Sequence, residues 1–511
     1  MRRGNSGNPL APPAKDAEAV GSTELTSAAE DRRGSSSTVL ELFSAMQRAG
    51  SWRSSDQGSK APLKSSVLGA SFNLTNTVVG AGIIGMPWAV EQSGIVGGIF
   101  FISLIAWITD LTLRMIIACG DRMKTLDYDA TVEAIFGRRA RLFCTATMGF
   151  FAYGAMVTYA VIIGDTVGTI AYEEPTQGQR AGIIFGFSLV AILPLCLLRN
   201  MSQLSSSSSL SILCVLTLVG LIIGLAPASA EDQDLDPLEF TFVRFESLPR
   251  GIGAIGFAFV CHHSAFTVRN SLQNPTPERW AKVTNSSIGF SYFIVLFLGL
   301  AGYSIFGDAA DGDILNSFED SDVGADVARG FLAVTMVFTF PMEHFIVRHI
   351  AYLFILEMKK SANQAAEASL LDAGIVENPI TPGIFREESS RQVAEVDADH
   401  SDGATIDPAD STAAAEPQTP PMPLKYLYGL TLVLWGSATC IAMSTNDLGF
   451  LLSLIGALGA SIIGYMFPAA MYYQTFKEEL STAQKAGLAI LFVFGVVTLV
   501  IGTATTIESV V

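Results

Sequence analysis

The sequence predicts an all-α polytopic membrane protein with eleven transmembrane helices, built as a five-plus-five inverted repeat whose first and sixth helices are broken. Half of the 511 residues are hydrophobic and 15% are charged, and several apolar runs exceed the ~18 residues that a bilayer-spanning helix requires. Glycine interrupts two of these runs at bilayer depth. Five spans separate the start of the first interrupted run from the start of the second, which is the spacing that an inverted repeat predicts.

The charge and cysteine content exclude several classes of protein. The formal net charge of −17 resides in loops and tails, whereas a nucleic-acid binder needs a concentrated basic patch. The six cysteines lie in or beside apolar runs, with a spacing that suits neither a disulfide framework nor a zinc site. No nucleophile motif, metal cluster or phosphate-binding loop indicates an enzyme, and no cofactor is predicted.

Two polar segments differ from the rest of the chain. Residues 1–64 mix Ser, Gly, Pro and both signs of charge, and residues 359–423 are rich in Ala, Ser, Pro, Glu and Asp. Such compositions bury too little apolar surface to fold, so we predict a disordered amino-terminal tail and a disordered acidic insert within a transmembrane domain at 65–511. Both segments offer binding sites for cytosolic partners.

The first span, residues 65–94, contains Gly80, Gly82 and Gly85, followed by Pro87. Glycine exposes the backbone and proline lacks an N–H donor. Inside a membrane, an opened backbone persists only where protein or a cavity satisfies it. We therefore predict a broken helix with an unwound joint near residues 79–82.

One face of the first half-span is small and polar, because Gly69, Asn73, Asn76 and Gly80 recur at helical spacing. Such a face does not favour contact with lipid. Two interpretations remain open: small residues and buried Asn also serve simple helix packing, whereas a discontinuous helix lines the substrate and ion site of secondary transporters.

The next four spans are predicted at residues 95–119, 142–172, 181–198 and 208–226. In the second span, Asp110 and Arg114 are four residues apart and are expected to pair. An amphipathic segment from Tyr128 to Phe136 follows this span and ends at Gly137.

The sixth span, residues 248–271, repeats the features of the first. Gly251, Gly253 and Gly256 open it, and polar residues from Cys261 to Ser264 occupy its centre. We therefore predict a second broken helix. The remaining spans are predicted at residues 281–306, 327–358, 424–443, 448–473 and 483–506.

Basic residues predict the orientation. They collect after the second, sixth and tenth spans, at Arg138, Arg139, Arg269 and Lys477, while the loops after the fifth and seventh spans are acidic. The positive-inside rule then places the amino terminus in the cytosol and Val511 outside. Counting spans places the acidic insert in the cytosol.

The two interrupted spans resemble a known family. SFNLTNTVVGAGIIGMPWAVEQSG at residues 71–94 resembles the first span of the sodium-coupled neutral amino acid transporters, within the amino acid and auxin permease family. FAFVCHHSAFTVRNSLQNPTPERWAKV at residues 257–283 resembles their sixth span and following loop, and residues 128–137 and 329–348 are also similar. The resemblance covers residues 62–506 without the insert, and it implies the family's five-plus-five inverted repeat with an eleventh helix.

The resemblance implies a secondary active transporter that carries neutral amino acids in symport with sodium by alternating access, in the plasma membrane or the vacuolar or lysosomal membrane. Two alternatives stay open: a proton-coupled amino acid carrier of the vacuole or lysosome, and an amino acid sensor that uses the same fold. The outer loops contain no cysteine, so the disulfide of some relatives is absent. The acidic insert is a second departure from the family.

An amino acid brings a carboxylate and an ammonium group, which both need partners inside the membrane. The joint offers the carboxylate free backbone N–H groups and the positive end of the second half-helix, and freed carbonyl groups in the sixth span offer partners to the ammonium. The predicted substrate-binding residues are Val79, Gly80, Ala81, Gly82 and Ile83 in the first span and Phe259, Val260 and His262 in the sixth.

A sodium ion needs several oxygen ligands, which carbonyl groups near Asn76 and Val79 and a hydroxyl of the eighth span can provide. The resemblance points to Asn76 and Thr339, with Thr335 as the alternative to Thr339. Thr339 equally fits a helix hydroxyl that bonds to its own backbone near Pro341.

Four of the five histidines lie in the sixth and eighth spans: His262, His263, His344 and His349. Histidine titrates near neutral pH, which allows a proton-coupled or pH-inhibited mechanism. His344 and His349 lie beside Glu343 and Arg348 in the chain and are expected to pair there. This leaves His262 as the predicted functional histidine.

Overall fold

The computed structural model describes residues 65–172, 175–198, 213–224, 241–318, 323–372 and 422–509. Apart from their connections and one isolated bridge between Ser65 and Leu272, these residues are helical. The chain divides into two compact units, Met1–Leu63 and Lys64–Val511, and the described residues all belong to the second. The predicted tail and most of the predicted insert lie outside the described residues.

Nine helices within the described residues are long and apolar enough to cross a membrane, which confirms an all-helical polytopic membrane protein. Five of them are single helices: α4 (Ile95–Met123), α6 (Arg138–Ala171), α12 (Pro277–Phe306), α13 (Val323–Asp372) and α15 (Leu424–Ser444). The predicted Asp110–Arg114 pair within α4 is confirmed at 2.7 Å. The predicted amphipathic segment is α5 (Tyr128–Phe136), and Gly137 ends it.

The other four candidate spans consist of consecutive helical pieces. They are α7 (Gln177–Phe187) with η2 (Ser188–Ile192) and α8 (Leu193–Cys196); α10 (Leu248–Phe259) with α11 (His262–Ser271); α16 (Leu448–Gly459) with η7 (Ala460–Met466) and α17 (Phe467–Phe476); and α18 (Thr482–Val497) with η8 (Thr498–Gly502) and α19 (Thr503–Glu508).

The first segment is broken where the sequence predicts it. It consists of α2 (Val67–Val78), the short η1 (Ala81–Ile83) and α3 (Met86–Ser93). The Ser66 side chain caps the start of α2, and the Val79 N–H donates to the Thr75 carbonyl at 2.7 Å as its last helical bond. Gly80 then has φ −85° and ψ −143°, which is not helical. The joint therefore opens at Val79 and Gly80.

The sixth span is also broken. α10 ends at Phe259, Val260 is extended with φ −74° and ψ 107°, and α11 begins at His262 after Cys261. The last carbonyl groups of α10 have no partner within their own helix, because a helix leaves its final four acceptors unpaired. Both predicted breaks are thus present.

Contacts among the connections place them at two opposite ends of the helices. At one end, which we name the Thr241 end, the Ile95 N–H donates to the Thr241 carbonyl at 3.0 Å, which joins the connection after α3 to the connection before α10. At the same end, Arg180 Nη1 donates to Asn446 Oδ1 at 2.9 Å. This bond joins the start of α7 to the connection between α15 and α16.

Other described connections meet at the opposite end, which we name the Ser271 end. The Ser65 N–H donates to the Ser271 carbonyl at 2.7 Å. Arg269 pairs with Asp121 at 3.3 Å, which joins the end of α11 to the end of α4. Successive connections therefore alternate between the two ends, as consecutive membrane crossings require.

One further segment crosses between these ends although neither of its helices is long. The broken segment runs from Ser65 at the Ser271 end to Ile95 at the Thr241 end. The described residues also include a short apolar helix, Leu213–Gly224.

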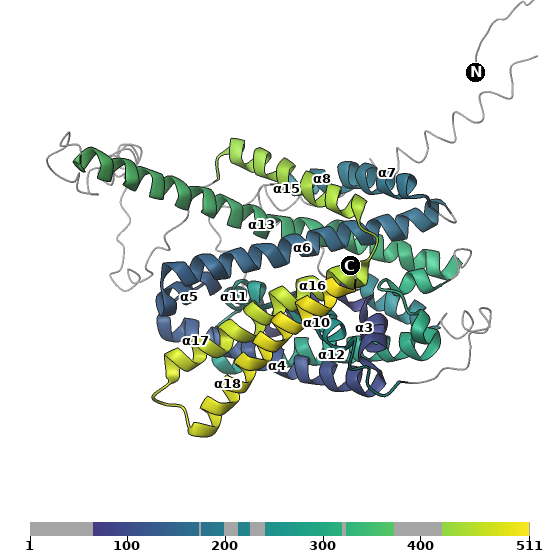
Figure 1. Cartoon of the computed structure of the whole chain (residues 1–511), viewed down its shortest axis with the longest axis horizontal. Helices are drawn as coiled ribbons and strands as arrows, with labels where there is room; N and C mark the ends of the chain where they lie inside the picture. The colour runs from purple at the N-terminus through teal and green to yellow at the C-terminus, as the bar shows by residue number, and fades with distance from the viewer. Residues whose placement is uncertain are drawn as a thin grey trace, which may run out of the picture. The chain divides into compact units, whose positions relative to one another are not determined.

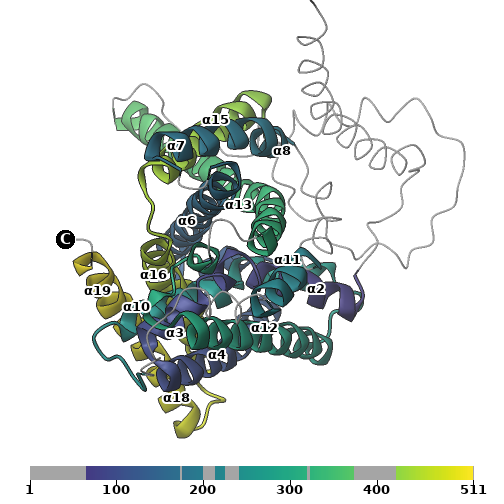
Figure 2. The same ribbon diagram turned by 90° about the vertical axis from the view of Figure 1, so that its right-hand side faces the viewer.

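The longest helices, α6 and α13, lie side by side with α15 packed against both (Figure 1). α4 and α12 form a second group with α3, and the α10–α16 pair lies between the two groups (Figure 2). α10 and α16 approach very closely. A Cβ placed on Gly456 would lie 1.9 Å from the Gly253 carbonyl oxygen, so only glycine permits this contact.

The predicted start of the insert at residue 359 is wrong. α13 continues to Asp372, so residues 359–372 are helical. The segment from Lys359 onward contains several Ala, Glu and Gln residues, which favour helix, and composition alone obscured this continuation.

We expect Gly456→Ala to destabilise the protein. The added methyl group forces α10 and α16 apart, and overpacking of this kind costs about 1–3 kcal/mol or more. Thermal unfolding of the detergent-solubilised protein measures the effect. The matched control is Gly220→Ala, because a Cβ on Gly220 meets no atom within 4 Å. Equal melting temperatures for the two variants would contradict the α10–α16 contact.

Candidate functional site

The two breaks face each other across a small cavity of about 10 Å³, which is roughly the space that one water molecule needs. Four segments of the chain contribute to it. Its lining comprises Thr77, Val78, Gly80 and Gly82 from the first segment, Phe151, Ala155 and Tyr159 from α6, Phe257, Ala258, Val260 and His263 from the broken sixth span, and Glu343 from α13. The structure is therefore closed around the breaks.

Glycine is what lets the breaks approach each other. A Cβ on Gly82 would lie 2.7 Å from the Ala258 Cα, so the joint touches the backbone of α10 directly. Gly80 differs, because its Cβ would meet the Tyr159 hydroxyl at an ordinary 3.7 Å. Of the two cavity-lining glycines, Gly82 alone lacks room for a methyl group.

The structure brings part of the predicted substrate site together. Gly80, Gly82 and Val260 line the cavity. Val79, Ile83 and Phe259 are buried next to them in the chain without lining it. The side chain of Ala81 lies outside the described residues, although its backbone belongs to η1.

The histidine that reaches the cavity is not the predicted one. His262 is fully buried and its Nε2 hydrogen-bonds to Thr112 Oγ1 on α4 at 2.8 Å, away from the cavity lining. His263 lines the cavity instead. One residue of helical rotation separates their directions by about 100°, and a single sequence does not fix that phase.

Glu343 is a cavity residue that the sequence analysis placed elsewhere. Its carboxylate Oε1 lies 3.6 Å from His263 Nε2, and its Oε2 has no hydrogen-bond partner among the described residues. The predicted pairing of His344 and His349 with Glu343 is wrong, because the histidine near this carboxylate is His263. Arg348 donates to the Cys196 carbonyl at 2.7 Å and to Thr431 Oγ1 at 2.9 Å. No hydrogen bond between described residues links His344 or His349 to this arginine either.

The predicted sodium ligands have mixed outcomes. The Thr339 hydroxyl donates to the Thr335 carbonyl at 2.8 Å, which is the alternative that the sequence left open, and Thr335 likewise donates to Phe331 at 2.9 Å. Both hydroxyl oxygens keep lone pairs for a cation. Asn76 is buried at 5% exposure in the last turn of α2. Pro341 provides no N–H, which leaves the Val337 carbonyl without its helical donor.

The Thr241 end of the site is covered by the connection between α12 and α13. The Ile314 N–H, in η5 (Ile314–Ser317), donates to the Ile84 carbonyl of the joint at 3.3 Å. A Cβ on Gly312 would lie 2.5 Å from the Gly449 nitrogen, so this connection also lies directly on α16. Asp313, which lies between Gly312 and Ile314 in the chain, is fully buried, and burial raises the pKa of its carboxyl well above the usual range.

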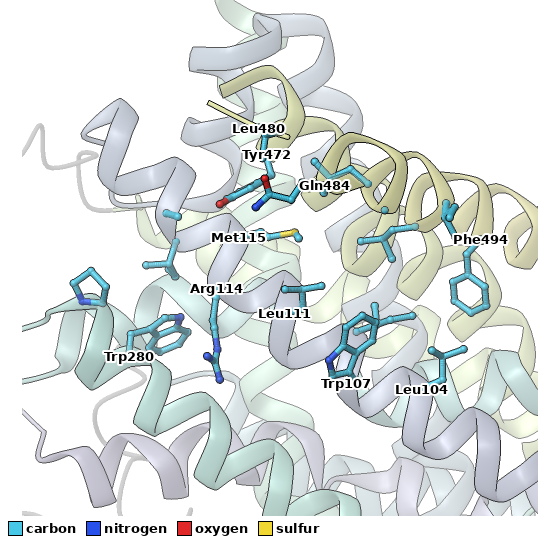
Figure 3. Close-up of a pocket in the computed structure, with 18 of the residues that line it drawn as sticks. Leu104, Trp107, Leu111, Arg114, Met115, Trp280, Tyr472, Leu480, Gln484 and Phe494 are labelled. Atoms are coloured by element: carbon cyan, nitrogen blue, oxygen red, sulfur yellow. The ribbon is translucent and has the colours of Figure 1, made fainter. Parts of the chain in front are cut away.

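A larger hollow of about 720 Å³ lies away from the breaks (Figure 3). Its apolar lining comes mainly from α4 and α18, with Trp107, Leu111 and Phe494 around it and Arg114 at its side. α12 and α17 add a few residues, among them Trp280 and Tyr472. Neither of the two helix breaks lines this hollow.

Residues 63–508 match the family described as transmembrane amino acid transporter protein. The chain is 26% identical over 444 residues to a Danio rerio protein named "Putative sodium-coupled neutral amino acid transporter 11", covering 86% of this chain and 85% of that protein. It is 31% identical over 296 residues to "Vacuolar amino acid transporter 2" of Saccharomyces cerevisiae, covering 56% of this chain and 62% of the yeast protein.

Two solved structures are also similar. One is a Na⁺-coupled sialic acid symporter in a substrate-bound outward-open state, at 13% identity and a TM-score of 0.47, covering 92% of this chain and 97% of that chain. The other is MhsT in complex with L-phenylalanine, at 13% identity and a TM-score of 0.46, covering 88% of this chain and 100% of that chain. Scores this low do not establish a common fold.

Proposed function

This chain belongs to the transmembrane amino acid transporter family, and on that premise we propose that it carries neutral amino acids in symport with sodium by alternating access. It is a multi-pass membrane protein and not an enzyme. The observation that carries the proposal is the meeting of two helix breaks at one cavity lined by Gly80, Gly82 and Val260.

The opened backbone suits a zwitterion. N–H groups around Gly80 and Gly82 have left the helical pattern of α2 and are available to a carboxylate. Carbonyl groups at the end of α10, around Phe259 and Val260, are available to an ammonium group. Transporters with discontinuous helices bind substrates in this way near the middle of the bilayer.

The number of crossings supports an inverted repeat. Nine candidate spans, the broken first segment and the helix Leu213–Gly224 make eleven crossings. The breaks then fall in the first and sixth crossings, which are equivalent positions in a five-plus-five repeat. The eleventh crossing, α18 to α19, follows the repeats.

For the coupling ion we propose sodium, held by Asn76, the Val79 carbonyl and Thr339. The support is a local excess of oxygen ligands: the opened backbone at Val79 and the Val337 carbonyl freed by Pro341. Sodium coupling also appears in the name of the Danio rerio relative.

A second candidate is a proton-coupled amino acid carrier of the vacuole or lysosome. The similarity to the Saccharomyces cerevisiae vacuolar transporter favours it, since that match has the higher identity of the two relatives. The two candidates share the substrate site and differ in the ion and the membrane.

We expect Gly82→Ala to abolish amino acid uptake. The methyl group cannot fit against Ala258, so the breaks cannot close around the substrate. Radiolabelled uptake, corrected for the amount of protein in the membrane, measures the effect. The matched control is Gly182→Ala on α7, where a Cβ meets no atom within 4 Å, and this variant should keep more than half of the uptake. Normal uptake by Gly82→Ala would show that the substrate binds elsewhere.

We expect external sodium to stimulate uptake of glutamine by the wild-type protein. Asn76→Ala should raise the sodium concentration for half-maximal uptake about tenfold, because losing one polar ligand costs about 1–3 kcal/mol. A sodium series at fixed pH tests this. A response to pH with no response to sodium would favour the proton-coupled carrier.

We expect the amino terminus and the insert to be cytosolic and Val511 to face outside. The reason is the clustering of basic residues at the Ser271 end together with an odd number of crossings. Protease protection of tags on sealed vesicles measures it. Equal protection of both chain ends would rule out eleven crossings.

A further inference from the structure

The Glu343 carboxylate is the feature of the cavity that the proposed function leaves unexplained. Among the described residues that line the cavity, it is the one Asp or Glu side chain, and no Lys or Arg accompanies it. It is 7% exposed, and its Oε2 has no hydrogen-bond partner among them. Its Oε1 lies near His263 alone. A buried carboxylate with so few partners is costly, and more so at bilayer depth, so its position favours the binding of a cationic group here.

The neighbouring protein groups do not supply that cation. His263 Nε2 is 3.6 Å from Oε1, which is too long for a hydrogen bond. Arg348, five residues further along α13, is committed to the Cys196 carbonyl and to Thr431. The cationic partner of the carboxylate is therefore expected to come from a ligand in the cavity.

The rest of the lining favours an organic cation over a metal ion. Aromatic rings surround the site: Phe151 lies 5.4 Å from Phe257 and 5.7 Å from His263 between ring centroids, and Tyr159 lines the same cavity. Ring faces attract ammonium groups. A sodium ion requires several oxygen ligands at once. The side chains of Phe151, Phe257 and Tyr159 in this lining instead offer aromatic rings.

We propose that Glu343 is the counter-ion for the ammonium group of the bound amino acid. The opened backbone at Gly80 and Gly82 lines the same cavity as Glu343. The proposal therefore places the substrate carboxylate on the joint and its ammonium group on α13. The inference rests on the proposed function, because it takes the cavity at the breaks as the substrate site.

The test compares an amino acid with its α-hydroxy acid analogue, in which a hydroxyl replaces the ammonium group. Each competes for uptake of the radiolabelled amino acid by the full-length protein in liposomes. We expect the wild-type protein to prefer the amino acid. Glu343→Gln, which keeps the shape and removes the charge, should reduce that preference about 30-fold or more. Glu343→Asp should restore part of it.

The matched control is Glu357→Gln, on the same helix at the Ser271 end, where Glu357 pairs with Arg138. This control should leave the preference unchanged. An unchanged preference in Glu343→Gln overturns the inference, as does an equal loss of affinity for both compounds. A shift in sodium dependence without a shift in preference assigns Glu343 to the ion instead.

The failure of this inference is distinguishable from the failure of the proposed site. If Gly82→Ala blocks uptake while Glu343→Gln keeps the preference, the cavity is the substrate site and the ammonium binds elsewhere in it. If Gly82→Ala transports normally, the substrate site itself is wrong. If Glu343→Gln is poorly folded, Glu343→Asp decides. Its shorter carboxylate should lower the preference for the amino acid over the hydroxy acid below the wild-type value, and an unchanged preference overturns the inference.

Discussion

Inside a membrane, every opened backbone group needs a partner from the protein, and this constraint shapes the molecule. Two helices are opened, so each break must be buried against other spans and shielded from lipid. The solution is to press the breaks together, with Gly82 directly on the Ala258 backbone. The close contact between α10 and α16 at Gly253 and Gly456 fixes the position of α10, the helix that ends at the second break.

The spans and the breaks could be predicted from the sequence because they depend on local chemistry. Apolar length reveals a crossing, and clustered glycine with proline reveals a break. The predicted span at residues 208–226 is represented among the described residues only by the helix Leu213–Gly224, which is too short to qualify alone. The insert boundary failed for a different reason, because Lys359 to Asp372 combine a polar composition with good helix formers.

The site was less predictable because it depends on how helices rotate against each other. His262 and His263 are neighbours with equal chemistry, yet one bonds to Thr112 and the other lines the cavity. Glu343 and Arg348 both lie beside histidines along α13, yet Arg348 donates to groups of α8 and α15 while Glu343 lines the cavity at the breaks. Such choices are set by neighbouring spans, and periodicity along one helix does not contain them.

α13 is far longer than a membrane crossing. Its 50 residues extend about 75 Å, against a hydrocarbon thickness of ~30 Å, and its far part passes the Ser271 end, where Glu357 pairs with Arg138. Pro341, where a helix bends most readily, lies two residues before Glu343. From Glu343 to Asp372 the helix extends about 40 Å, so a small change in its direction at Pro341 would displace Asp372 far more than it displaces Glu343.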